Sequence, residues 1–98
     1  MVMTDQTAKD IFHAIRSEMD RASKVWPNWP NDPMHAMGVL TEELGEMQRE
    51  ANMLCYEPHK ASKAALMNEA IQLGAMVFRF LASIESYQFE PGESHRQD

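Results

Sequence analysis

Glu42-Glu43-Leu44-Gly45-Glu46-Met47 lies inside a helical pattern that runs from about Pro33 to Leu54. The apolar residues of this pattern recur every three or four positions: Met37, Leu40, Leu44, Met47, Ala51 and Leu54. This spacing predicts a helix that buries one stripe. At about 100° per residue, Glu43, Glu46 and Glu50 fall along one edge of the stripe, whereas Glu42 points away from it. These carboxylates form either a solvated acidic face or a site for a cation that offsets their repulsion.

A second helical pattern covers residues 61–87 and carries Glu69 and Gln72 beside its apolar stripe. The stripe residues are Leu66, Ala70, Leu73, Val77, Phe80, Ile84 and Tyr87. Only residues 55–60 separate the two patterns, and so short a connection predicts an antiparallel hairpin. Counting outward from the turn brings Glu46 level with Glu69, and Glu43 level with Gln72. The two patterns therefore predict three carboxylates and one amide around a single point.

This predicted cluster suits a hard divalent cation. Mg²⁺ prefers oxygen ligands in octahedral array and is typically held by a few carboxylates together with substrate phosphates; Mn²⁺ is a possible substitute. The expected ligands are Glu43, Glu46, Glu69 and Gln72. Without a metal ion, the packed carboxylates are expected to raise one another's pKa.

Glu43-x-x-Glu46 followed by Glu69-x-x-Gln72 resembles the all-α nucleotide pyrophosphohydrolases of the MazG type. Their pattern is ExxE on one helix and ExxD on the next, and members include dimeric dUTPases and dCTP pyrophosphatases. The resemblance covers about residues 26–87, and its most specific part is the string at residues 42–47. The sequence departs from the family pattern at Gln72, which keeps a carbonyl oxygen but lacks the charge of Asp. Weaker metal binding is the expected consequence.

The resemblance implies an antiparallel all-α bundle with Mg²⁺-dependent pyrophosphohydrolase activity. Such an enzyme would cleave the α–β bond of a ribo- or deoxyribonucleoside triphosphate, giving a monophosphate and pyrophosphate. Glu43, Glu46 and Glu69 would be the catalytic metal ligands. The proton acceptor would be Glu46 or Glu42, and the sequence does not choose between them. Two alternatives remain: a nucleotide- or protein-binding module that kept the fold without turnover, and a purely structural oligomer.

Composition limits the possible partners and location. The 98 residues predict one domain over residues 1–88 with a polar tail at 89–98. A net charge of −6 argues against binding nucleic acid. No stretch is long and apolar enough to span a membrane, so no membrane partner is expected. The single cysteine excludes an intramolecular disulfide and is typical of a cytoplasmic protein.

Outside the acidic cluster, three residues are candidate substrate contacts. A first helix is expected at residues 5–23, with a buried stripe of Ala8, Ile11, Phe12, Ile15, Met19 and Ala22. The proline-rich connection after it holds both tryptophans; Trp29 either caps the core or stacks on a nucleobase. His35 could reach a phosphate or a base edge, and Lys63 could approach a phosphate tail; the alternative for each is an ordinary surface side chain.

The third predicted helix is apolar on nearly every side between residues 70 and 84, apart from Gln72, Arg79 and Ser83. A helix of this kind is buried on all sides, which a single three-helix unit does not achieve. We therefore expect a homodimer or homotetramer whose interface uses Ala75, Met76, Phe78 and Ala82.

Overall fold

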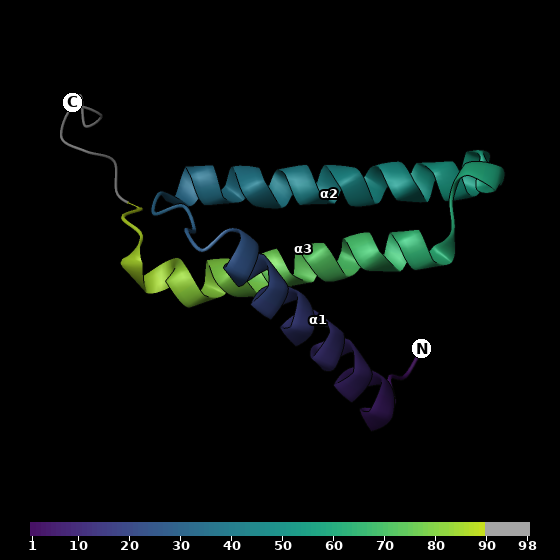
Figure 1. The fold of residues 1–98 in the computed structure, drawn as a ribbon, viewed down its shortest axis with the longest axis horizontal. Helices are drawn as coiled ribbons and strands as arrows, with labels where there is room; N and C mark the ends of the chain where they lie inside the picture. The colour runs from purple at the N-terminus through teal and green to yellow at the C-terminus, as the bar shows by residue number, and fades with distance from the viewer. Residues whose placement is uncertain (90–98) are drawn as a thin grey trace.

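A computed structural model describes residues 1–89, and within that range the secondary structure is entirely helical (Figure 1). The elements are α1 (Asp5–Val25), α2 (Pro33–Tyr56), the 3₁₀ turn η1 (Pro58–Lys60), α3 (Lys63–Ser83) and the 3₁₀ turn η2 (Ile84–Ser86). The all-α prediction is thus confirmed, and the first two helices lie within two residues of the predicted bounds. The predicted tail from residue 90 onward lies outside the described residues. None of the helices in residues 1–89 combines the length and apolar content that crossing a membrane requires.

Each long helix begins at a side-chain cap that the sequence signals. The hydroxyl of Thr4 accepts from the backbone N–H of Thr7, and the hydroxyl of Ser62 accepts from that of Ala65. The carboxylate of Asp32 accepts from the backbone N–H of His35, with Pro33 as the first helical residue. These side chains satisfy backbone donors that the first helical turn leaves unpaired.

The helices α2 and α3 lie side by side and antiparallel, while α1 crosses α3 and its N-terminal half projects away from the hairpin (Figure 1). The crossing is built on small residues, because Ala22 of α1 and Ala75 of α3 are both fully buried. A side chain added at Gly74 would lie 3.0 Å from the Cδ1 atom of Ile15. The absence of a side chain at Gly74 therefore permits this close approach of α1 to α3.

The third helix ends earlier than predicted. α3 stops at Ser83, η2 follows, and Tyr87 has extended backbone rather than continuing the helix to residue 87. Tyr87 is only 8% exposed. Its hydroxyl accepts a hydrogen bond from Nε1 of Trp29 and lies 3.3 Å from the carbonyl oxygen of Pro30. Outside the helix, Tyr87 contacts the loop between α1 and α2.

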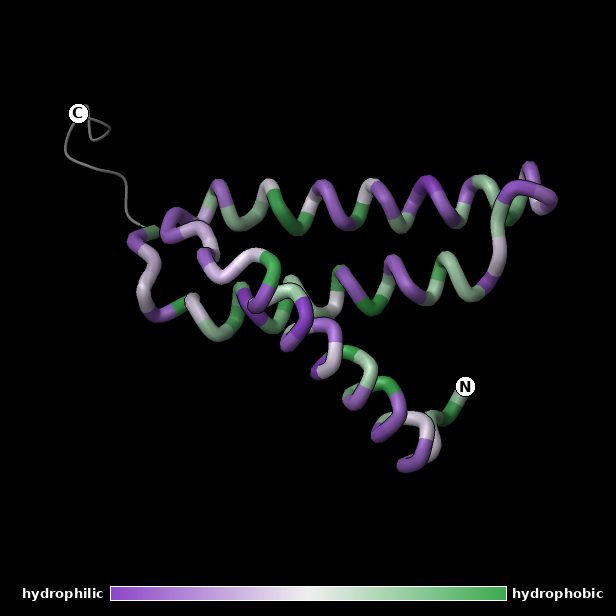
Figure 2. The backbone as a smooth tube through the Cα atoms, viewed as in Figure 1, coloured by the Kyte–Doolittle hydropathy of each residue, from purple (hydrophilic) through white to green (hydrophobic). Residues whose placement is uncertain are grey.

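The predicted buried stripes are only partly buried in the single chain. Several of their members are exposed: Ile11, Phe12, Met37, Leu44 and Val77. On α2 the fully buried position is Ala36 rather than Met37. Glu43 follows Ala36 by two helical turns, lies on the same face and is half-buried. Figure 2 shows hydrophobic segments along the projecting part of α1 as well. Three helices with α1 splayed away do not cover one another's apolar faces.

Two residues of the predicted subunit interface belong instead to the core of the single chain. Ala75 is fully buried and Met76 is 7% exposed, because α1 crosses α3 at these positions. Phe78, at 40% exposure, and Ala82 remain on the outside of α3. The interface prediction was therefore wrong for Ala75 and Met76, and the apolar surface still exposed on α3 centres on Val77, Phe78 and Leu81.

Candidate metal centre and adjoining cleft

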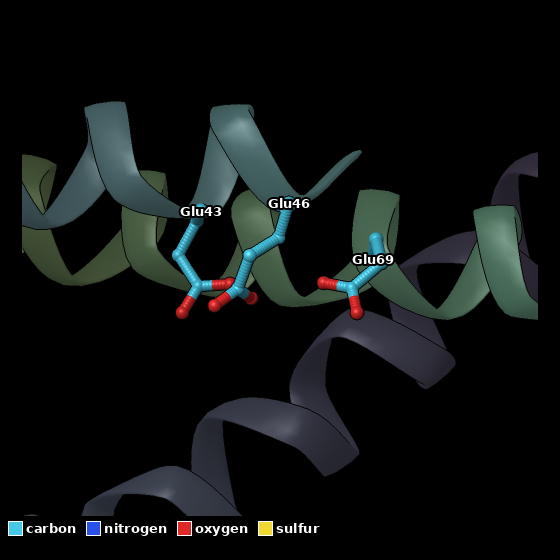
Figure 3. A group of neighbouring side chains, drawn as sticks. All are labelled: Glu43, Glu46 and Glu69. Carbon is cyan, nitrogen blue, oxygen red and sulfur yellow. The ribbon is translucent and has the colours of Figure 1, made fainter. Parts of the chain in front are cut away.

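The three carboxylates that the helical patterns predicted to meet do lie together. Glu43 and Glu46 come from α2 and Glu69 from α3, with one oxygen of each within 4.8 Å of the other two. Figure 3 shows the three side chains directed toward the same region between the helices. The i, i+3 spacing on α2 places Glu43 and Glu46 on one face, and the antiparallel hairpin brings Glu69 opposite them.

Two carboxylate oxygens of the cluster are buried without a hydrogen-bonding partner from the protein. Glu43 and Glu69 are half-buried, whereas Glu46 is exposed. The Oε2 atoms of Glu43 and Glu69 are buried, and neither forms a hydrogen bond. A buried acceptor of this kind costs free energy unless a donor or a cation meets it.

The electrostatics of the cluster follow from burial and from like charges. Burial raises the pKa of Glu43 above its ordinary value, and the neighbouring carboxylates raise it further. Burial is also the first cause of the raised pKa of Glu69, followed by the charge of Glu46. Glu43, Glu46 and Glu69 are therefore the residues that could hold a cation.

A cleft of about 850 Å³ adjoins the cluster at Glu43. Its walls come from α1, the loop between α1 and α2, and the facing sides of α2 and α3. The lining residues are Glu18, Arg21, Trp26, Asn28, Trp29, Pro30, Asn31, His35, Val39, Glu42, Glu43, Gln72, Met76 and Arg79. One end of the cleft is thus acidic, and the other is aromatic and amide-rich with two guanidinium groups.

Most of the predicted site residues line this cleft. Gln72 lies one turn after Glu69 and shares the lining with Glu43. The exposed side chains of Glu42 and His35 also face the cleft, as does the half-buried Trp29. Lys63 does not line it; as the first residue of α3 it is exposed, almost two turns before Glu69.

Sequence reasoning missed the two arginines of the cleft. The guanidinium carbon of Arg79 lies 5.0 Å from the ring centroid of Trp29, and Nη2 of Arg79 donates to the carbonyl oxygen of Trp26. Arg21 lies 5.8 Å from the ring centroid of Trp26. Arg79 had a sequence signal as the one charged residue within the apolar run at residues 70–84. Arg21 had none, because it is one polar residue among many on the first helix.

Comparison with known proteins places one curated relative beside this chain. The protein YpjD of Bacillus subtilis (strain 168), described as uncharacterized, is 33% identical over 94 residues, which cover 95% of this chain and 80% of YpjD. No family model matches the chain. No solved structure matches it either.

Proposed function

We propose that this chain, which belongs to the family of the Bacillus subtilis protein YpjD, is a Mg²⁺-dependent nucleoside triphosphate pyrophosphohydrolase of the MazG type. The reaction would cleave the α–β bond, giving a nucleoside monophosphate and pyrophosphate. One observation carries the proposal: the carboxylates of Glu43 and Glu69 hold buried oxygens without a hydrogen-bonding partner, and Glu43 also lines a cleft large enough for a nucleotide.

The acidic end fits a hard cation. Glu43, Glu46 and Glu69 would hold Mg²⁺, and Gln72 would offer a neutral carbonyl oxygen from the cleft wall. Mg²⁺ bound there would neutralise phosphate charge and favour attack by water. The buried Oε2 atoms would then gain the partner that they lack, which offsets the cost of their burial.

Two exposed carboxylates are available to take the proton from the attacking water. Glu42 is exposed and lines the cleft beside Glu43, and Glu46 is exposed at the rim of the cluster. A general base must lie within hydrogen-bond reach of the proton that it removes. Glu42 would act on a water bound in the cleft, and Glu46 on a water bound at the cluster.

The opposite end of the cleft suits the nucleoside. Trp26 and Trp29 present indole rings, and stacking of a base on an aromatic side chain contributes about 1–3 kcal/mol. His35 also lines the cleft. A protein with a net charge of −6 repels an anionic substrate. The proposal therefore includes a cation at the cluster, which would offset this repulsion.

A second copy of the chain is also part of the proposal. Within residues 1–89, many large apolar side chains are exposed, which a stable isolated domain would cover. A standard interface covers about 800 Å² per partner. Exposed apolar residues such as Phe12, Phe78 and Leu81 are candidates for that interface.

The activity is tested by pyrophosphate release from a panel of nucleoside triphosphates, with Mg²⁺ and with EDTA. We expect Mg²⁺-dependent release that Glu69→Gln abolishes and the control Glu85→Gln leaves intact. Mg²⁺ binding without release from any nucleotide would favour the alternative, a binding module without turnover, for which the neutral Gln72 is the supporting observation. Light scattering at micromolar concentration tests the assembly, and a monomeric mass would refute it.

A further inference from the structure

Arg79 is held in the cleft by two contacts. Its guanidinium group lies against the face of Trp29, with 5.0 Å between the guanidinium carbon and the ring centroid. Nη2 of Arg79 donates to the carbonyl oxygen of Trp26 over 2.8 Å. The ring of Trp29 is itself fixed, because its Nε1 donates to the hydroxyl of the buried Tyr87. A guanidinium held in this way is preorganised to bind a ligand.

The charge of Arg79 has no carboxylate partner among residues 1–89. The ion pairs of this part of the chain are Arg16 with Asp20, Arg21 with Glu18, and Lys60 with Glu57. Arg21, the other arginine of the cleft, donates to both oxygens of Glu18 over 2.8 and 2.5 Å. Arg79 is therefore the cleft cation whose hydrogen-bond donors are not committed to an acid.

The position of Arg79 matches the base rather than the phosphates of a bound nucleotide. Gln72, Met76 and Arg79 lie on one face of α3 and all line the cleft. Arg79 follows Gln72 by seven residues, a rise of about 10 Å along the helix. Phosphates at the carboxylate cluster would therefore leave the nucleoside extending toward Arg79 and the two tryptophans.

The donor chemistry of arginine selects among bases. A guanidinium has five N–H donors and no acceptor, and it pairs with carbonyl oxygens such as O6 of guanine, whereas adenine presents an amino donor at the same position. We propose that Arg79 is a specificity-determining residue that donates to a carbonyl oxygen of the base, so that the cleft prefers nucleotides with oxo bases to those with adenine. This inference rests on the proposed function only in that the cleft binds a nucleotide.

Inosine and adenosine nucleotides differ only at the N1–C6 edge of the base, where hypoxanthine carries an oxygen at C6 and a hydrogen on N1, whereas adenine carries an amino group at C6 and an acceptor at N1. Monophosphates lack the α–β bond, so binding is measured without turnover. Both tryptophans of the chain line the cleft, which makes tryptophan fluorescence a direct readout. With Mg²⁺ present, we expect the wild type to bind IMP about 10-fold more tightly than AMP. Arg79→Met should bring this ratio to about one, and Arg49→Met, which changes an exposed arginine outside the cleft, should retain it.

A ratio near one in the wild type, or a preference for IMP that survives Arg79→Met, would overturn the inference. If circular dichroism shows that Arg79→Met does not fold, Arg79→Lys decides: a reduced ratio supports the inference and an unchanged ratio overturns it. Failure to bind either monophosphate also overturns it. The proposed hydrolysis is judged separately. Pyrophosphate release without a base preference would support the hydrolase proposal and overturn the role of Arg79. A base preference without pyrophosphate release would support the role of Arg79 and not the hydrolase proposal.

Discussion

Replacing Glu69 by glutamine removes one charge from the carboxylate cluster while nearly preserving side-chain shape. Its buried Oε2 atom has no partner, and the carboxylates of Glu43 and Glu46 lie within 4.8 Å. At that distance two unit charges repel by about 0.9 kcal/mol in water and about 3.5 kcal/mol at an effective dielectric constant of 20. The lower figure applies to the pair with Glu46, which is exposed and screened by salt; taken for both pairs, it gives at least about 1–2 kcal/mol of relief.

In EDTA at pH 8, Glu69→Gln should therefore be more stable than the wild type. For a domain of this size, about 1 kcal/mol raises the midpoint of thermal unfolding by roughly 4–8 °C. In Mg²⁺ the order should reverse, because a ligand at 100 times its dissociation constant stabilises the native state by about 2.7 kcal/mol. The wild type has the full carboxylate set for the cation, whereas the variant lacks one member.

The assay is thermal unfolding followed by circular dichroism at one protein concentration, with EDTA and with Mg²⁺. Glu85→Gln, an exposed glutamate outside the cluster, is the matched control and should leave the Mg²⁺ response unchanged. A Glu69→Gln protein that is less stable than the wild type in EDTA would refute the electrostatic reasoning. Equal stabilisation of both proteins by Mg²⁺ would show that Glu69 is not a ligand.

Three further predictions follow from the same geometry. Folding raises the pKa values of Glu43 and Glu69, so the native state binds more protons than the unfolded chain. In EDTA, the free energy of unfolding should therefore fall as the pH rises through the raised pKa values. Thermal unfolding measured from pH 4 to 8 would contradict this if it showed no such fall relative to Glu69→Gln. Gln72→Asp adds a carboxylate to the cleft wall, so calorimetry should find tighter Mg²⁺ binding and EDTA should reveal a less stable apo protein. Tyr87→Phe removes only the hydroxyl that fixes Trp29, so the fluorescence of Trp29 should change and nucleotide KM should rise, with Mg²⁺ affinity unaffected.

Local patterns in the sequence determined the helices and the carboxylate cluster. The caps at Thr4, Asp32 and Ser62 act within three or four residues, so the local sequence indicates them without knowledge of the tertiary structure. The convergence of Glu43, Glu46 and Glu69 needed only two helical periodicities and a short turn, because a tight antiparallel hairpin leaves little freedom in register.

Only the tertiary structure decided where α1 lies and what it covers. The crossing of α1 over α3 depends on small residues far apart in the chain, Ala22 and Ala75, and it placed Ala75 and Met76 in the core while leaving Phe12 exposed. The same crossing and the turn at Tyr87 assembled the cleft, which brought Arg79 to the loop of Trp29. Such contacts join residues more than fifty positions apart, and helical periodicity carries no information about them because it describes each helix alone.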